Sequence, residues 1–170
     1  VFKSLWTKAG ADEIKLKSKI ITTTIRCPGN DVLKATLKTE NMYSRHITKY
    51  LLIQQELLSN KSKGYDNAIG SYTTEHVLPQ SLNGQWAIDF TNQEHKDLVH
   101  TIGNLIPLSK KMNNKVGNSD WNDKRKSLKG SNWKLTQTFA QKKKWNPNHV
   151  QKRTNELIKW LVKEWPAING

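Results

Sequence analysis

The chain of 170 residues has the length of one domain that can bury a hydrophobic core of its own. Its 28 Lys and Arg against 14 Asp and Glu give a formal charge of +14, which favours nucleic acid as a partner and, second, an anionic membrane surface. No apolar run approaches the ~20 residues of a membrane-spanning helix and no signal-peptide pattern opens the chain, so we expect a soluble, cytoplasmic protein.

Cysteine content limits the metal chemistry. Cys27 is the only cysteine, which excludes a disulfide or an all-cysteine zinc site within the chain. Any metal must therefore rely mainly on oxygen and nitrogen ligands, which suit Mg²⁺ or Mn²⁺. Because the chain begins with Val1 rather than Met, we also expect a fragment of a longer protein.

The N-terminal part of the chain is expected to form a helical layer. Residues 14–25 are ambiguous between helix and strand, and residues 28–30 have the composition of a turn. Over residues 31–58 apolar side chains recur mostly at steps of three and four, which predicts helices. Residues 60–70 are polar and contain glycine, which indicates a connection.

The middle of the chain contains two predicted strands and two capped helices. A strand over residues 71–78 is stopped by a proline, and Thr91 with Glu94 forms a capping box for a helix over about 92–100. A second short strand is predicted over 104–108.

The remaining helices also have start signals. Ser109 is expected to cap a helix that stops near Gly117. Asn146 and Pro147 provide a cap and a first-turn proline for the C-terminal helix, whose apolar stripe predicts that the nearby tryptophans are core residues rather than base-stacking platforms. We predict an α+β, mostly helical single domain. Its parts are an N-terminal helical layer (residues 1–70), a hairpin–helix (ββα) core (71–130) and C-terminal helices (131–170).

Glu75 and His76 are neighbours in the first predicted strand. Adjacent strand residues point to opposite faces, so these two side chains cannot be a simple pair in one core face unless the strand end twists. Taken alone, the dipeptide is also typical of a strand end with one solvated carboxylate and one half-buried histidine.

Four short motifs follow one another along the chain. They consist of Glu75, His76, Val77, Pro79 and Gln80; Gly103, Asn104, Leu105, Leu108 and Ser109; Asn113 and Asn118; and Trp145, Arg153, Leu157 and Trp165. This pattern resembles the HNH (ββα-metal, His-Me finger) nucleases, and more narrowly the C-terminal domain of GmrSD-type, modification-dependent restriction proteins. The similarity covers residues 43–165.

The resemblance implies a role for each site residue. His76 would be the general base, and Glu75 and Asn113 would bind a Mg²⁺ or Mn²⁺ ion. Asn114 follows directly and remains an alternative ligand, although only one of two successive helical residues can point at the ion. Asn104 would instead tie the loop between the strands through amide hydrogen bonds.

Further residues are assigned supporting roles. Asn118 and His100 are expected to have structural or supporting positions near the site, with an ordinary surface position as the alternative for His100. Lys115, Lys124 and Arg125 are expected to contact DNA phosphates, with a solvated helix face as the alternative.

The implied function is hydrolysis of DNA phosphodiester bonds by a metal-dependent HNH endonuclease. The resemblance further implies an effector domain of an anti-phage restriction protein that acts on DNA, including modified phage DNA. An NTP-using or sensing N-terminal domain would complete the full protein. The alternative is a non-catalytic basic nucleic-acid-binding domain, and RNA as a substrate also remains open.

Overall fold

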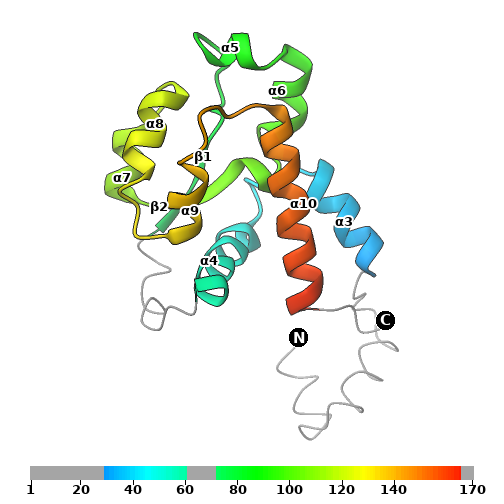
Figure 1. The fold of residues 1–170 in the computed structure, drawn as a ribbon. Coiled ribbons are helices and arrows are strands. Elements are labelled where there is room, and N and C mark those ends of the chain that lie inside the picture. Colours follow the sequence, from blue (N-terminus) through cyan, green and yellow to red (C-terminus); the bar gives the residue numbers. More distant parts are fainter. Residues whose placement is uncertain (1–28, 61–71, 166–170) are drawn as a thin grey trace, which may run out of the picture.

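The computed structural model describes residues 29–60 and 72–165, apart from the side chains of Asn60 and Lys115 (Figure 1). The predictions for residues 14–25 and for nearly all of the 60–70 connection therefore lie outside the described residues. In chain order the elements are α3 (Asn30–Thr39), α4 (His46–Asn60), β1 (Tyr72–His76), α5 (Trp86–Asp89), α6 (Asn92–Leu98), the 3-10 turn η2 (Ile102–Asn104), β2 (Leu105–Ser109), α7 (Lys110–Val116), α8 (Trp121–Leu128), α9 (Lys134–Phe139) and α10 (Pro147–Glu164).

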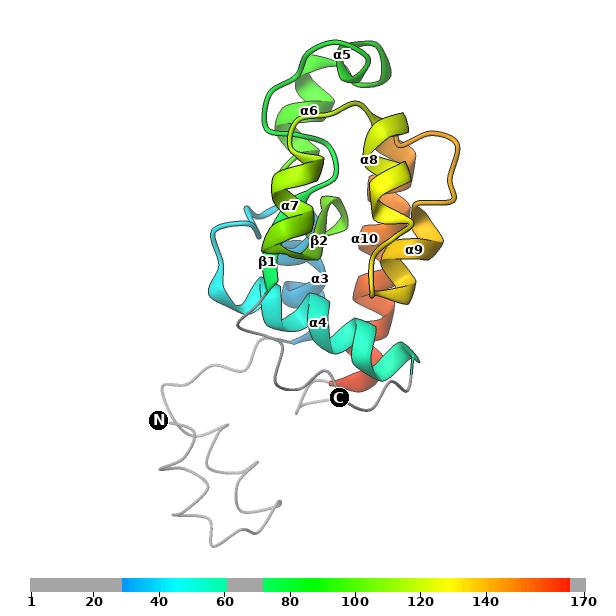
Figure 2. The same ribbon diagram turned by 90° about the vertical axis from the view of Figure 1, so that its left-hand side faces the viewer.

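The fold is α+β and mostly helical, as predicted. Strands β1 and β2 form a two-stranded antiparallel sheet, in which Glu75 lies opposite Ile106 and His76 opposite Leu105. Helix α10 runs through the middle of the molecule between α3 and the hairpin, and α4 crosses the lower end (Figures 1 and 2). The small sheet is thus embedded in a helical domain.

Helix α10 packs closely against η2 at Gly103. A Cβ atom at that position would lie 2.1 Å from the Thr154 hydroxyl and 2.3 Å from the Val150 carbonyl oxygen, so only glycine allows this approach. The Arg153 side chain donates from Nη1 to the carbonyl oxygens of Gly103 and Leu105 at 2.8 and 2.7 Å. Together these contacts fix the chain where it enters β2.

Local capping signals correctly predicted where several helices begin. The Thr91–Glu94 capping box is present at the start of α6, and the Ser109 hydroxyl accepts from the Met112 amide at the start of α7. Asn146 caps α10, with Pro147 at its first position. Each of these interactions spans one helical turn, which makes it visible in the sequence.

The strand boundaries differ from the prediction. β1 ends at His76 rather than at residue 78, although Val77 and Leu78 are completely buried. Their backbone leaves the sheet because the Asn104 side chain accepts from the Leu78 amide and donates to the Leu78 carbonyl, at 2.8 and 2.9 Å. Asn104 itself belongs to η2, and β2 starts one residue later than predicted.

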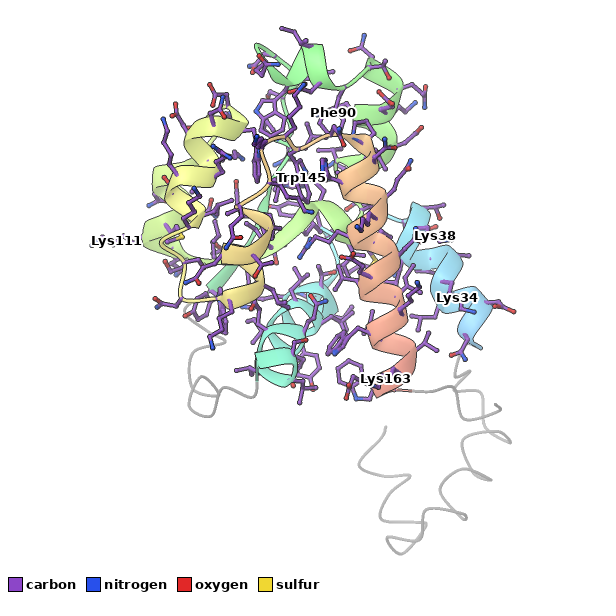
Figure 3. All side chains as sticks on the ribbon, viewed as in Figure 1. Lys34, Lys38, Phe90, Lys111, Trp145 and Lys163 are labelled. Carbon is purple, nitrogen blue, oxygen red and sulfur yellow. The ribbon has the colours of Figure 1, made fainter. Side chains whose placement is uncertain are left out.

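The surface is rich in lysine and the interior in aromatic side chains. Figure 3 shows Lys34 and Lys38 of α3, Lys111 of α7 and Lys163 of α10 pointing outward, whereas Trp145 lies inside. Trp145 has no exposed surface, and Trp133 is 3% exposed, as expected for core residues. Trp165 differs from that prediction because it is 42% exposed. In the described part of the chain no helix has both the length and the hydropathy needed to cross a bilayer.

Candidate active site

Strands β1 and β2 and helix α7 form a compact hairpin–helix unit. The helix follows β2 without a loop, because Ser109 both ends the strand and caps α7. Helix α7 therefore turns back over the sheet and contacts both strands. This places the side chain of Asn113 beside β1, the strand that carries Glu75 and His76.

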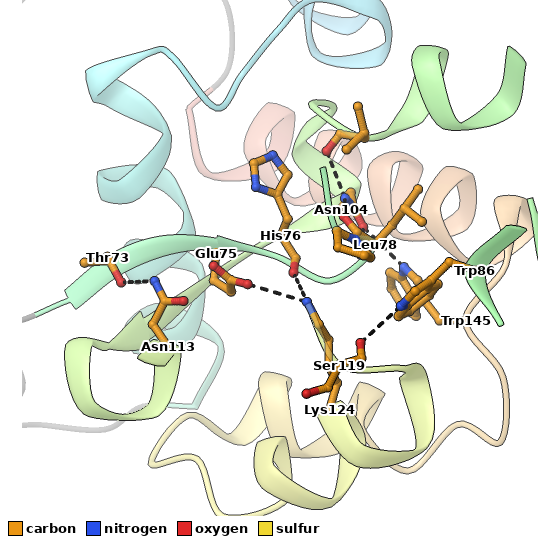
Figure 4. A network of polar contacts seen from close by, with 12 residues as sticks. Thr73, Glu75, His76, Leu78, Trp86, Asn104, Asn113, Ser119, Lys124 and Trp145 are labelled. Carbon is orange, nitrogen blue, oxygen red and sulfur yellow. Dashed lines mark hydrogen bonds and ion pairs between the residues drawn. The ribbon is translucent and has the colours of Figure 1, made fainter. Parts of the chain in front are cut away.

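Glu75 and His76 project from opposite sides of β1. Figure 4 shows the Glu75 carboxylate on the side of α7 and α8, whereas the His76 ring lies on the other side of the strand. This agrees with strand geometry, in which neighbours alternate between faces. A reacting phosphate must therefore lie across β1 or its end if both side chains are to act on it.

His76 is enclosed by aromatic rings. Its side chain is 3% exposed, its ring centroid lies 4.2 Å from that of Tyr43, and its Nε2 atom lies 3.1 Å from Nδ1 of His100. One imidazole donates and the other accepts in this contact. If Nε2 of His76 carries the hydrogen, it donates to His100, and Nδ1 of His76 holds the free lone pair.

The environment of His76 favours the neutral imidazole. Burial lowers the pKa of His76 to about 3, and the charges of His100, Lys124 and His95 act in the same direction. Burial also lowers the pKa of His100, together with the charge of His95. His76 is therefore uncharged at neutral pH and can accept a proton.

Asn113 is held by a hydrogen bond from α7 to β1. Its Nδ2 donates to the Thr73 hydroxyl at 3.0 Å, and that hydroxyl donates to the Leu108 carbonyl at 3.2 Å. Thr73 and Glu75 are two residues apart in β1 and so share one face. Because the amide nitrogen is engaged by Thr73, the amide oxygen remains as an acceptor on the side of Glu75 (Figure 4). Asn114, in contrast, is exposed to solvent.

One carboxylate and one amide oxygen fit a hard divalent ion. Such an ion accepts water and phosphate oxygens at its remaining positions, so a sparse protein ligand set is sufficient at a phosphodiester. Among the residues that the structure describes, no three His, Cys, Asp or Glu side chains form a metal-binding cluster. Two protein oxygens at Glu75 and Asn113 therefore suit Mg²⁺ or Mn²⁺ better than they suit zinc.

Lys124 is placed differently from the sequence prediction. Instead of reaching DNA, its side chain is 1% exposed and points from α8 toward β1. Its Nζ atom donates to the His76 carbonyl at 2.8 Å and lies 3.5 Å from the Glu75 carboxylate. Burial raises the pKa of Glu75, and the Lys124 charge opposes this rise. The ammonium group thus connects the backbone of the proposed base to the side chain of a proposed ligand.

The sequence contains a signal for the position of Lys124 that the prediction missed. Trp121, Lys124 and Leu128 recur at steps of three and four and are all buried. A lysine is almost never fully buried unless it has a partner, so a lysine in an apolar helical stripe indicates a buried, paired side chain. That pattern separates Lys124 from Lys126, which lies off the stripe.

Asn104 is at the centre of the loop that follows β1. It is completely buried and accepts from the Leu78 amide and from Trp145 Nε1. Its Nδ2 donates to the carbonyl oxygens of Leu78 and Val99, and its own carbonyl accepts from the Val77 amide. Every polar atom of the side chain is used inside the fold, which leaves none for an ion.

Asn118, Arg125 and Lys115 are the remaining predicted residues. Asn118 is exposed in the turn after α7. Arg125 is half-buried and donates from Nη1 to the Lys142 carbonyl at 3.2 Å. The Lys115 side chain is outside the described part, so its predicted phosphate contact stays a prediction.

Comparison with known protein families gives a match over most of the chain. The model of the family described as GmrSD restriction endonucleases, C-terminal domain, matches residues 27–160 of the chain. No curated protein and no solved structure matches.

Proposed function

Because the chain belongs to the family of GmrSD restriction endonuclease C-terminal domains, and thus to the restriction-type nucleases, we propose that it is a metal-dependent HNH endonuclease acting on DNA. The observation that supports the proposal is the hydrogen bond from Asn113 in α7 to Thr73 in β1, which brings the Asn113 side chain to the strand face that also bears Glu75. His76 follows at the end of the same strand. Asn113, which is distant in sequence, thereby lies at the strand that carries the neighbouring Glu75 and His76.

In this proposal His76 takes the proton from the attacking water. It is neutral at physiological pH and so starts in the form that can accept. An anionic phosphate beside the ring would raise the pKa of His76 from its low value, because a nearby negative charge favours the imidazolium. His76 would therefore become a stronger base when DNA is bound.

Glu75 and Asn113 would hold the divalent ion. A bound Mg²⁺ or Mn²⁺ would supply charge stabilisation for the departing oxygen. The Thr73 hydroxyl engages the amide nitrogen of Asn113, so the amide oxygen would be available to the ion, and Lys124 limits the movement of Glu75. His76 and the two ligands would thus act on opposite ends of one scissile bond.

The wider role of the protein is also part of the proposal. A nuclease of this family would serve as the effector of an anti-phage restriction system in the cytoplasm, with modified phage DNA as a substrate. A sensing or NTP-using domain in the full protein would control it. The strongly basic composition supports a polyanionic substrate.

Plasmid nicking tests the proposal. We expect cleavage by the chain with Mg²⁺ or Mn²⁺ and none with EDTA. His76→Ala should abolish cleavage while leaving DNA affinity nearly unchanged. Asn113→Ala should reduce cleavage strongly, and Asn114→Ala, on the exposed neighbour, is the matched control that should retain it. DNA binding without metal-dependent cleavage at any protein concentration would favour a non-catalytic binding domain.

A further inference from the structure

A groove of about 430 Å³ runs between β1 and the segment that leads into α4. One wall is formed by Tyr43, Arg45, His46 and Lys49, and the other by the first residues of β1, including Thr73. Figure 2 shows this N-terminal end of α4 beside β1. Glu75, His76 and Asn113 are not among the residues that line it.

The groove is lined by cations and hydroxyl groups. Arg45, His46 and Lys49 line it together with Ser44 and Thr73, and none of the described residues that line it carries a carboxylate. The first turn of α4 also carries no acidic side chain, so no negative charge there offsets the positive end of the helix dipole. This composition suits a phosphate, which accepts hydrogen bonds and carries negative charge.

Lys49 and Arg45 differ in how free they are to bind a ligand. Within the described residues Lys49 forms no ion pair, and its side chain is half-buried in the groove. Arg45 is paired with Glu40 at 3.2 Å in a partly exposed salt bridge, which contributes little to stability. Glu40 therefore competes with any anion for the guanidinium group.

Both walls of the groove touch the candidate active site. The Tyr43 ring packs on the His76 ring with a centroid distance of 4.2 Å. Across the groove, the Thr73 hydroxyl accepts from Nδ2 of Asn113. A chain of phosphates in the groove would thus reach residues that contact the proposed base and one proposed ligand.

We propose that this groove binds the phosphodiester backbone of the nucleic acid strand that is cut. The inference rests on the proposed nuclease function for the identity of the strand, and it adds the path that the strand follows. Lys49 and Arg45 contact phosphates beside the scissile bond and position that bond at β1. Such contacts supply affinity and register without reading sequence.

Salt-dependent binding in EDTA tests the groove independently of cleavage. The probes are a fluorescent DNA duplex and the matching single strand, measured by anisotropy at several salt concentrations. For Lys49→Gln we expect weaker binding and a plot of log K against log salt that is shallower by about 0.7–0.9, the value for one lost phosphate contact. Lys159→Gln, an exposed lysine of α10 that lines a different groove, is the matched control and should change neither.

A second variant tests the same groove by a gain of binding. Glu40→Gln removes the competitor of Arg45 and should tighten binding and steepen the salt dependence.

Melting temperatures of all variants identify loss of folding. Equal effects of Lys49→Gln and Lys159→Gln, an unchanged affinity in Glu40→Gln, or no binding of either probe at low salt would each overturn the proposal. If groove variants weaken binding but the chain never cleaves with metal, only the nuclease function fails. If the chain cleaves but the groove variants bind normally, only the groove fails.

Discussion

The buried His76 should make the stability of the fold depend on pH. Its pKa is about 3 in the folded protein against an ordinary value of 6.5. As the pH falls through 6.5, the unfolded chain takes up a proton at this residue while the folded protein does not. The contribution of His76 to stability is therefore complete above its pKa in the unfolded chain. It is lost progressively as the pH falls toward its pKa in the folded protein.

The size of this effect follows from linkage. Between about pH 7.5 and about pH 5.5, protonation of one group in the unfolded chain alone lowers the free energy of unfolding by about 1.4 kcal/mol. His100 and His149, whose pKa values are also lowered by burial, add to the total loss in the wild-type protein. Comparing the loss in wild type with the loss in His76→Gln isolates the contribution of His76. The pKa of His100 is lowered by burial and by His95, and not by His76.

Urea denaturation in EDTA at the two pH values measures this difference. The wild-type protein should lose about 1.4 kcal/mol more than His76→Gln over the interval. The absolute stability of the variant does not enter, since only the change with pH is compared. An equal loss in the two proteins would show that His76 titrates normally in the folded state and is not enclosed by Tyr43 and His100 as described.

Other predictions concern the contacts that hold the site. Asn104→Ala should cost roughly 3–5 kcal/mol in the free energy of unfolding, because it leaves several buried backbone groups and Trp145 Nε1 unpaired. Gly103→Ala should cost at least about 2 kcal/mol, since its Cβ would meet the α10 backbone; Gly130→Ala, which meets one atom at 3.4 Å, is the control. Lys124→Met should cost about 2 kcal/mol, because the His76 carbonyl loses its donor. Urea denaturation measures the free energy of unfolding of all three variants. Losses below about 0.5 kcal/mol would contradict these contacts.

Sequence reasoning predicted the features that depend on neighbouring residues. The capping box at Thr91 and the cap at Asn146 each join residues three positions apart, so their patterns are visible locally. The end of β1 was missed because the apolar residues Val77 and Leu78 continue the strand pattern. What stops the strand is the amide of Asn104, which is 26 residues away from Leu78.

The arrangement of the candidate site depends on contacts over longer distances. Lys124 reaches the His76 carbonyl across 48 residues, and Asn113 reaches Thr73 across 40. Tyr43 and His100 enclose His76 from two other segments. The motif indicated the candidate side chains, whereas their burial, pairing and faces depend on tertiary packing that no local pattern specifies.

The central claim is that Glu75 and Asn113 bind one divalent ion next to His76. Its most direct test is anomalous diffraction from crystals of His76→Ala with a DNA duplex and Mn²⁺. We predict one manganese peak at coordination distance from both the Glu75 carboxylate and the Asn113 amide oxygen, with a phosphate oxygen on the same ion. A manganese ion bound elsewhere in the chain, or DNA bound with no ion between these two side chains, would contradict the account.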